Sequence, residues 1–303
     1  MNKLIGIKVD VDTYKGMRKG VPILLDLFRK YNIRVSFFVP TGKDHTGWTA
    51  KRVFTRKGFL KKAGRVGVLS TYGIKTLLYG LLLPGPEIAR KSTGLLHEII
   101  DRGHELGIHG HDHVYWHDHI KHLSDRKTRE ELVKSLSTYR EIIKKDPQSF
   151  AAPGWMINPY ALCFFEENNF VYTSNTRGVS PFFPVMSDKS FKILEIPTTL
   201  PTLDEVVGVA GYDIETLVNL YMNSLKNGLN ILTVHTELEG NKWSNFLEMF
   251  IKKTLKEGFT FKRIIDIAND LIDSENIPSY KSEYGQIEGR AGEVCLQTDI
   301  FDV

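Results

Sequence analysis

Hydrophobic and polar positions alternate along the chain with two periods, one typical of strands and one of helices. Residues 4–9 are mostly apolar and predict a strand that ends at Asp10. Apolar residues then recur at spacings of three and four between Val21 and Tyr31, which predicts a helix with Pro22 in its first turn. A second strand is expected at 33–39. Strand, helix and strand in this order form a βαβ unit, which builds a parallel sheet.

The same alternation resumes after residue 86. Helices are expected at 87–102, 127–145, 160–168, 214–225, 246–257 and 261–272, and strands at 105–108, 150–152, 170–173, 191–196 and 230–234. About seven strands with intervening helices, and no break in composition, predict a single domain over 1–303. Its sheet is expected to be a (β/α) barrel or doubly wound. Two pieces look irregular, an insertion at about 43–86 and a tail at about 273–303.

Composition argues against a membrane-spanning protein, a disulfide-rich protein and a dedicated nucleic-acid-binding protein. With 303 residues, 42% apolar and 25% charged, the chain is expected to be globular. The longest apolar run, residues 77–83, is too short to cross a bilayer. Two cysteines without a CxxC spacing exclude a disulfide framework and favour a reducing compartment, and we expect no secretory signal at the N-terminus. A formal net charge of only +4 argues against a dedicated nucleic-acid-binding protein.

Two carboxylates lie where the first strand ends. Asp10 and Asp12 alternate along the chain, so both side chains are expected on one face. Two carboxylates at one strand end repel each other, and burying them requires a cation or a proton. The alternative is a simple turn in which one aspartate caps a helix.

Histidines are concentrated after a later strand. Seven of the ten lie between 104 and 122, and His109 and His113 have the i, i+4 spacing that suits a divalent metal, although the pair His113 and His117 has it too. A solvated histidine-rich loop is the alternative. His235 ends another apolar strand, and Glu237 and Glu239 after it are candidates to orient it. The alternative is a structural histidine followed by polar loop residues. Two histidines and one carboxylate leave positions open on a metal, which favours metal-assisted hydrolysis.

Together these motifs resemble the polysaccharide deacetylase (NodB-homology) family. The shared features are Asp-x-Asp after the first strand, His-x-x-x-His after a later one, a Pro-Gly turn at 153–154 and a lone histidine after a late strand. The resemblance implies a distorted (β/α)7 barrel, with the insertion after its second strand, and a divalent metal, usually zinc. It implies the following roles: catalytic base Asp10, metal ligands Asp12, His109 and His113, and general acid His235.

A narrower resemblance covers nearly the whole chain. Residues 10–13, 20–22, 84–88, 196–202, 204–208, 235–240 and 289–290 are similar to the 4-deoxy-4-formamido-L-arabinose-phosphoundecaprenol deformylases. This implies hydrolysis of the N-formyl group of an undecaprenyl-phosphate-linked amino sugar, in the aminoarabinose modification of lipid A. It implies a cytoplasmic protein on the inner face of the cytoplasmic membrane. The alternatives are an N-deacetylase of another saccharide and a non-catalytic metal- or lipid-binding protein on the same scaffold.

The chain departs from the family at two motifs. Many relatives carry an arginine in the third motif, where this chain has residues 151–155, and often an aspartate at the position of Asn175. Arg177 is a candidate to replace that arginine in orienting Asp10, and a backbone N–H near Gly154 and Trp155 is a candidate to hold the oxyanion. We therefore predict a supporting set that contacts the substrate or positions the catalytic groups: Gly154, Trp155, Asn175, Arg177 and Glu237.

The insertion accounts for the net charge. Residues 43–65 hold eight basic residues and one acidic residue, a sum of +7, so the rest of the chain sums to −3. Aromatic residues are interleaved and an apolar stretch follows, which favours contact with an anionic membrane surface. The residues expected at this interface are Trp48, Arg52, Phe54, Lys57, Lys61, Leu78 and Tyr79. The alternative is an insertion packed on the barrel with its charges solvated. No nucleic acid is expected, and the oligomeric state stays open.

Overall fold

A curved parallel sheet forms the centre of the molecule. The computed structural model describes residues 3–52, 67, 71–211, 213–272 and 276–299. Six strands follow one another in order across the sheet: β1 (Leu4–Asp10), β2 (Ser36–Val39), β3 (Glu105–Ile108), β4 (Ser149–Phe150), β5 (Tyr172–Thr173) and β8 (Leu194–Glu195). β9 (Leu229–His235) and the short β10 (Thr260–Lys262) both pair with β1. Seven of these parallel strands form the expected (β/α)7 half-barrel, which confirms the predicted fold class.

Isolated hydrogen bonds bridge the gap between β9 and the residues that follow β8. The N–H groups of Thr199 and Leu200 both donate to the Ile231 carbonyl at 3.1 Å. Thr198 and Thr233 share a hydroxyl hydrogen bond of 2.7 Å. The barrel is therefore distorted here, because these residues continue β8 only through isolated contacts rather than a regular ladder.

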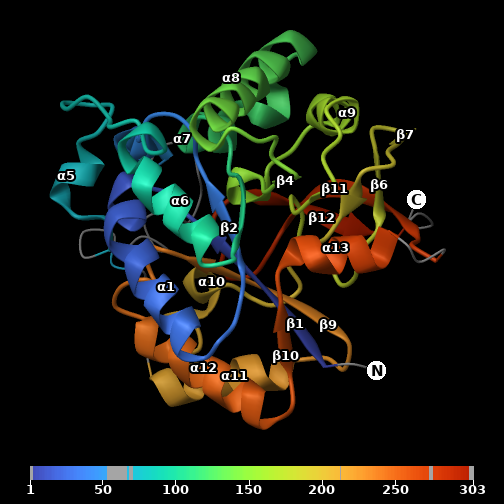
Figure 1. Cartoon of the computed structure of the whole chain (residues 1–303). Helices are drawn as coiled ribbons and strands as arrows, with labels where there is room; N and C mark the ends of the chain where they lie inside the picture. The colour runs from blue at the N-terminus through green and yellow to red at the C-terminus, as the bar shows by residue number, and fades with distance from the viewer. Residues whose placement is uncertain (1–2, 53–66, 68–70, 212, 273–275, 300–303) are drawn as a thin grey trace.

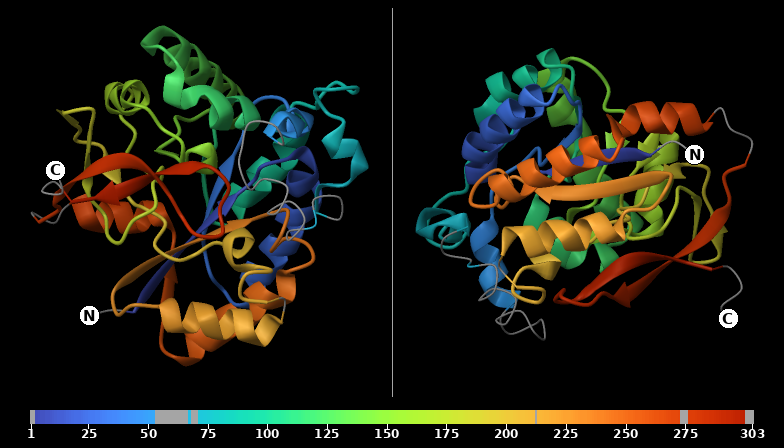
Figure 2. Two further views of the ribbon diagram at one scale, coloured as in Figure 1. Left: turned by 180° about the vertical axis from the view of Figure 1, so that it is seen from behind. Right: turned by 90° about the horizontal axis from the view of Figure 1, so that it is seen from below.

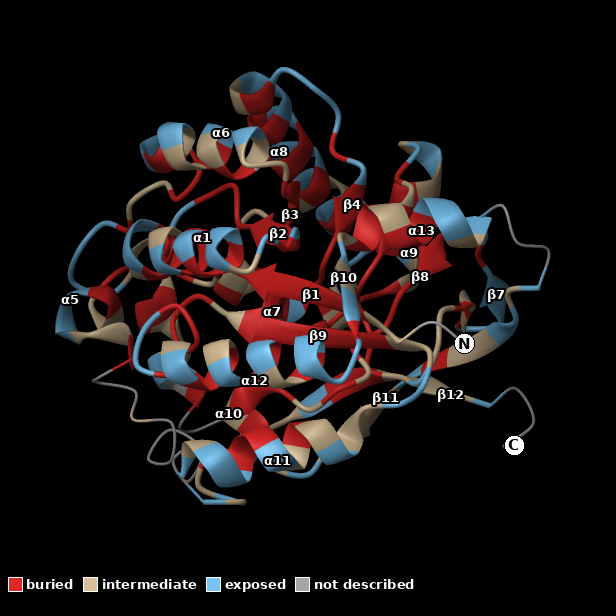
Figure 3. Ribbon diagram, turned by 60° about the horizontal axis from the view of Figure 1, so that its bottom comes forward, coloured by how far each residue is buried: buried red, intermediate tan, exposed pale blue. Residues whose placement is uncertain are grey.

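Helices cover the outside of the sheet (Figures 1 and 2). They are α1 (Val21–Lys30), α6 (Thr93–Asp101), α7 (His113–His119), α8 (Asp125–Ile143), α9 (Pro159–Glu167), α10 (Leu203–Val206), α11 (Ile214–Ser224), α12 (Ser244–Lys256) and α13 (Ile264–Ile272). In α1, the side chains of Val21, Leu24 and Phe28 are buried against the sheet, as their spacing predicts. Figure 3 shows β1 and β9 buried between helices whose outer faces are exposed.

Strand register sets where the polar residues meet. Asp10 is paired with His235 across β1 and β9, and Ile108 of β3 is paired with Val39 of β2. Because all these strands are parallel, their carboxyl ends lie at the same edge of the sheet. The residues that follow β1, β3 and β9 are therefore brought together there.

The C-terminal tail forms regular structure, so the prediction of an irregular tail was wrong. A second sheet has the order β12-β11-β6-β7, with β6 (Phe183–Met186), β7 (Lys189–Ser190), β11 (Ser279–Gln286) and β12 (Glu293–Thr298). The hydropathy pattern did not predict β11, because most of the side chains of this strand are polar. Its partner β6 also went unpredicted, since Pro184 is unusual within a strand.

The insertion contains short helical pieces in the part that the structure describes, η2 (Thr46–Lys51) and α5 (Ile74–Leu77). It is tied to the body near β1, since Asp44 accepts a hydrogen bond from the Tyr14 N–H at 2.9 Å. The expected interface residues Phe54, Lys57 and Lys61 lie outside the described residues. Within the described ranges, no helix combines the length and apolar character needed to cross a membrane.

Candidate metal centre and active site

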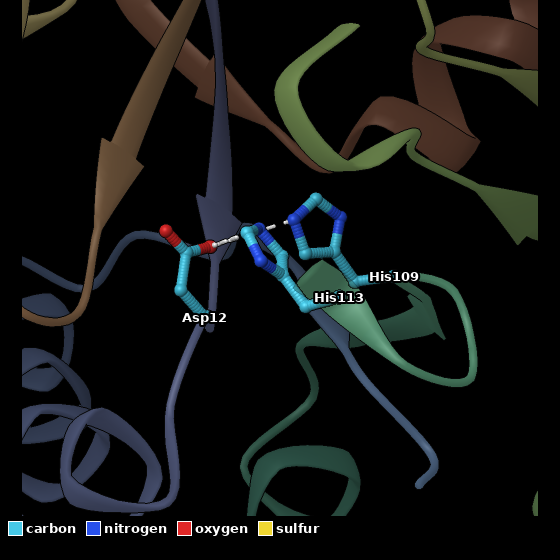
Figure 4. Close-up of side chains that lie close together, drawn as sticks. All are labelled: Asp12, His109 and His113. Atoms are coloured by element: carbon cyan, nitrogen blue, oxygen red, sulfur yellow. Dashed lines mark ion pairs between the residues drawn. The ribbon is translucent and has the colours of Figure 1, made fainter. Parts of the chain in front are cut away.

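Three predicted metal ligands meet at the carboxyl edge of the sheet (Figure 4). Asp12 Oδ1 lies 3.2 Å from His113 Nε2 and 3.5 Å from His109 Nε2. The three ligand atoms all lie within 4.8 Å of one another. Burial acts to raise the pKa of the Asp12 carboxyl, but the imidazoles of His113 and His109 outweigh it and hold that pKa well below its usual range.

Local structure orients the His109 imidazole and sets the start of the helix that carries His113. His109 directly follows β3, and its Nδ1 is 2.8 Å from the Ala151 carbonyl oxygen, so Nδ1 donates and Nε2 keeps its lone pair. His113 is the first residue of α7, whose N-cap Asp112 accepts a hydrogen bond from the Tyr115 N–H at 3.0 Å.

The donor set fits a divalent metal ion. Two imidazole nitrogens and one carboxylate oxygen are the ligands of catalytic zinc sites, which keep a position open. Asp12 Oδ1 is buried and has no hydrogen-bond partner in the described structure. A buried carboxylate oxygen without a partner is costly, and a cation at this point would satisfy it. Among the described residues, His109 and His113 are the histidines that group with Asp12 as a possible metal site.

Asp10 is held by Lys8 and not by Arg177. Lys8 Nζ lies 3.4 Å from Asp10 Oδ2, and both side chains are almost completely buried. Burial lowers the pKa of the Lys8 ammonium, while Asp10 and Glu195 oppose that effect. Asp10 Oδ1 is buried without a hydrogen-bond partner among the described residues and lines the cavity. The carboxylate is therefore oriented on one side and open on the other, as a base requires.

His235 lies beside Asp10 at the end of β9. Its backbone N–H donates to Glu239 Oε2 at 2.9 Å, and its Nδ1 is buried without a partner in the described residues. Burial disfavours the protonated imidazole, but the surrounding carboxylates, first those of Asp12 and Asp204, raise the pKa of His235. The imidazole therefore lies among carboxylates on the same cavity as Asp10, where a proton donor would face the substrate.

Glu237 supports the candidate metal ligand Asp12, and the hydrogen bonds of its Oε1 go to the Asp12–Thr13 turn and not to His235. Its Oε1 accepts hydrogen bonds from the Asp12 N–H at 3.2 Å, the Thr13 N–H at 2.9 Å and the Thr13 hydroxyl at 2.7 Å. Gly16 packs against the same carboxylate, since a Cβ there would come within 2.0 Å of Glu237 Oε1. The turn that carries Asp12 is therefore fixed by a side chain from the far end of the sequence.

The Pro-Gly turn presents Trp155 to the cavity. Gly154 and Trp155 both have positive φ, 64° and 54°, which is rare for a residue as bulky as tryptophan. The indole N–H donates to Thr198 Oγ1 at 3.1 Å. Three cations lie over the indole ring, at 4.4, 5.0 and 5.2 Å: Arg290, Lys8 and Arg177. The Trp155 N–H donates to the Ala152 carbonyl at 3.1 Å, so this N–H is already used within the turn.

Asn175 and Arg177 belong to a buried polar network behind Trp155. The Asn175 N–H and side chain both bond to Glu195, at 2.5 and 3.3 Å. Arg177 donates to Glu205 Oε1 at 2.5 Å and to the Leu200 carbonyl at 2.9 Å. The expectation that Arg177 orients Asp10 was therefore wrong, because the Arg177 guanidinium is hydrogen-bonded to Glu205.

One cavity of about 150 Å³ connects these groups. Its walls include the ligand triad, Asp10, His235, Gly154 and Trp155, and also residues that the sequence analysis did not select: Thr46, Thr49, Tyr72, Leu77, His117, Asp204 and Arg290. Tyr72 and Leu77 come from the insertion and Arg290 from the turn between β11 and β12. The candidate base, the candidate general acid and the candidate metal site thus face one space.

Comparisons with known proteins agree with this geometry. A family model described as polysaccharide deacetylase matches residues 3–171, more than half of the chain. The chain belongs to the polysaccharide deacetylase family. Members of the family hydrolyse amide bonds, so this deacetylase-family protein is a hydrolase acting on such a bond.

Two relatives cover this deacetylase-family protein almost completely. It is 34% identical over 293 residues to the probable 4-deoxy-4-formamido-L-arabinose-phosphoundecaprenol deformylase ArnD of Wigglesworthia glossinidia brevipalpis, covering 94% of this chain and 99% of the relative. It is 33% identical over 302 residues to the ArnD protein of the same description from Shewanella sediminis, covering 98% and 96%. The predicted likeness to this subgroup is confirmed.

Solved structures share the fold at lower identity. A probable polysaccharide deacetylase from Pseudomonas aeruginosa superposes with a TM-score of 0.62 at 16% identity, covering 90% of this chain and 92% of the other. Puue allantoinase gives a TM-score of 0.61 at 16% identity, covering 90% and 91%. These structures establish the likeness in fold.

Lys8 is the important residue that sequence reasoning missed. It stands two residues before Asp10 in a strand, so both side chains point to the same face. A lysine within a buried strand needs an oppositely charged partner, and Asp10 on the same face is the candidate. Arg290 lies in the 289–290 segment of the narrower resemblance, but its place on the cavity wall depends on the β11–β12 pairing, which no local pattern predicts.

Proposed function

We propose that this protein hydrolyses the N-formyl group of undecaprenyl-phosphate-linked 4-deoxy-4-formamido-L-arabinose, in the aminoarabinose modification of lipid A. The geometric observation behind the proposal is the convergence of Asp10, the Asp12 triad and His235 on one cavity. The substrate comes from the printed names of the two full-length relatives. The implied cofactor is zinc, which suits two imidazoles and a carboxylate.

The chain's own residues divide the reaction between them. Asp12, His109 and His113 would hold the metal, which when bound supplies a Lewis acid for the amide carbonyl and acidifies water. Asp10, held by Lys8, accepts the proton of the attacking water through its open carboxylate oxygen. His235, on the neighbouring strand, donates a proton to the departing amine.

A side-by-side assay tests this function. The metal-loaded protein is given formylated and acetylated forms of the undecaprenyl-linked amino sugar, with Asp10→Asn as the inactive control that keeps metal. Preferential release of formate supports the proposal. Preferential release of acetate would instead favour an N-deacetylase. Turnover of neither form would favour a non-catalytic metal- or lipid-binding protein.

Contact with the inner face of the cytoplasmic membrane is the second part of the proposal. Four apolar side chains of the insertion are exposed: Ile74, Leu81, Leu82 and Leu83, at 70, 49, 78 and 37%. The other expected contact residues that the structure describes are buried, half-buried or bonded within the protein. Arg52 and Tyr79 are buried, Leu78 is half-buried, and the Trp48 indole donates to the Gly80 carbonyl at 2.8 Å. Exposed leucines on a basic segment favour an interface with anionic lipid.

Flotation with anionic liposomes tests the membrane contact. Leu82→Glu should reduce binding strongly, because a carboxylate is repelled by anionic lipid and by the acyl region. Val133→Glu on α8 is the matched control, since Val133 is also exposed, at 50%. Equal flotation of both variants and the parent would contradict the proposal.

A further inference from the structure

Arg52 is a buried cation on the wall of the catalytic cavity that the hydrolysis itself does not use. It follows η2 of the insertion, its exposed fraction is 9%, and it lines the same cavity as Asp12 and His113. Its Nη2 is buried and has no hydrogen-bond partner in the described part of the chain. A buried guanidinium N–H without an acceptor is costly unless a ligand supplies one.

The rest of the side chain is held in place. Arg52 Nε lies 2.9 Å from Asp118 Oδ1 on α7, the helix that also carries the ligand His113. This contact anchors the guanidinium by its Nε and leaves Nη2 without an acceptor. A planar guanidinium is the side chain whose geometry best matches two phosphate oxygens.

The other two arginines of the site both lie close to carboxylates of α10. Arg177 donates to Glu205, and Arg290 Nη1 lies 3.6 and 3.8 Å from Glu205 and Asp204. Arg290 also stacks on Trp155. Arg290 Nη1 is likewise buried without a hydrogen-bond partner among the described residues, but two carboxylates lie within 4 Å of it and balance its charge. Arg52 differs in belonging to the insertion, the segment that carries the exposed leucines.

The insertion links the cavity to the exposed leucines. Arg52 and Leu77 line the cavity, and Leu81 and Leu82 of the same segment face solvent. In a lipid-linked sugar the phosphodiester lies between the sugar and the hydrocarbon chain. A sugar in the cavity whose lipid runs toward the leucines therefore places its phosphate along this segment.

We propose that Arg52 binds the phosphodiester of the lipid-linked substrate and so selects phosphate-linked sugars over neutral glycosides of the same sugar. This inference rests on the proposed function, which supplies the phosphate. It assigns Arg52 to substrate binding within the cavity and not to the bilayer surface.

The test compares two substrates, the formamido sugar on a short prenyl phosphate and its methyl glycoside. In Arg52→Gln the ratio of kcat/KM for the phosphodiester over the glycoside should fall about 10- to 100-fold, mainly through KM. Arg52→Lys should recover part of the ratio, because it restores the charge. Arg90→Gln, which removes an exposed arginine charge, should leave the ratio unchanged.

Three results would overturn the assignment. An equal loss on both substrates in Arg52→Gln, with metal content and melting temperature unchanged, would make Arg52 a structural residue. An unchanged ratio together with weaker binding to anionic vesicles would assign Arg52 to a lipid headgroup. If the metal-loaded parent turns over neither substrate, the proposed function is wrong as well. This result differs from the first two, which concern Arg52 alone and leave the proposed function standing.

Discussion

Lys8 Nζ lies 3.4 Å from Asp10 Oδ2 inside the sheet, and both side chains come from the same face of β1. The pair is supplied by one strand, so its geometry depends on strand alternation and not on a distant loop. Lys8 also lies 5.0 Å from the Trp155 ring, which places the ammonium between the base and the Pro-Gly turn. The orientation of the base is therefore built into the first strand.

Lys8→Met should lower kcat by about 10- to 100-fold. Removing one partner of a buried ion pair leaves the Asp10 carboxylate without its cation and without the contact that orients it. Steady-state kinetics and metal analysis provide the measurement. Lys8→Arg is the control and should retain more activity. A Lys8→Met protein with parental kcat would show that Asp10 does not depend on this contact.

Glu237→Ala should weaken metal binding by about 10- to 100-fold, because groups that orient a ligand affect affinity by that amount. The variant loses three hydrogen bonds that hold the Asp12–Thr13 turn. Competition with a chelator measures the change. Glu237→Gln keeps an acceptor oxygen and should retain most of the affinity. If Glu237→Ala binds metal as tightly as the parent, the turn is held by other contacts.

Gly154→Ala should destabilise the protein by about 1–2 kcal/mol and reduce activity. A Cβ at this position would lie 2.5 Å from His117 Nε2, and φ is +64°. The clash would displace α7, which carries His113. Chemical denaturation measures the free energy of unfolding. Gly94→Ala is the matched control, because no atom lies within 4 Å of its added Cβ, and it should be neutral or slightly stabilising.

Stability should fall as the pH is lowered from about 6.5 toward 4, in part through His104. Its Nδ1 accepts a hydrogen bond from the Val35 N–H at 3.1 Å, and burial, aided by nearby arginines, lowers its pKa to about 4. The unfolded chain binds this proton near pH 6.5 and the folded chain does not, so acid favours unfolding, by of order 2 kcal/mol across the window.

His104→Asn isolates this effect, because the amide oxygen can accept the Val35 hydrogen bond and does not titrate. Denaturation curves at several pH values should give the variant a smaller loss of unfolding free energy between pH 6.5 and 4. Parallel curves for the variant and the parent would show that His104 is not the source.

Much of the sheet was predictable because apolar strands and amphipathic helices carry strong periodic signals. The strand before Asp10, the helix from Val21 and the apolar strand before His235 all appear where the pattern places them. β11 and β6 escaped prediction because their stability comes from pairing with each other and with β12, which no local period records.

The sequence by itself determined which residue types stand at the strand ends, and hence the candidate base, ligands and acid. Only the tertiary structure decided how they are supported. Lys8 replaces the expected Arg177 beside Asp10, Glu237 holds the Asp12 turn, and Arg52 turns inward to Asp118. Spacing along a chain fixes which side chains share a face, but contacts between distant segments depend on packing, which local patterns do not encode.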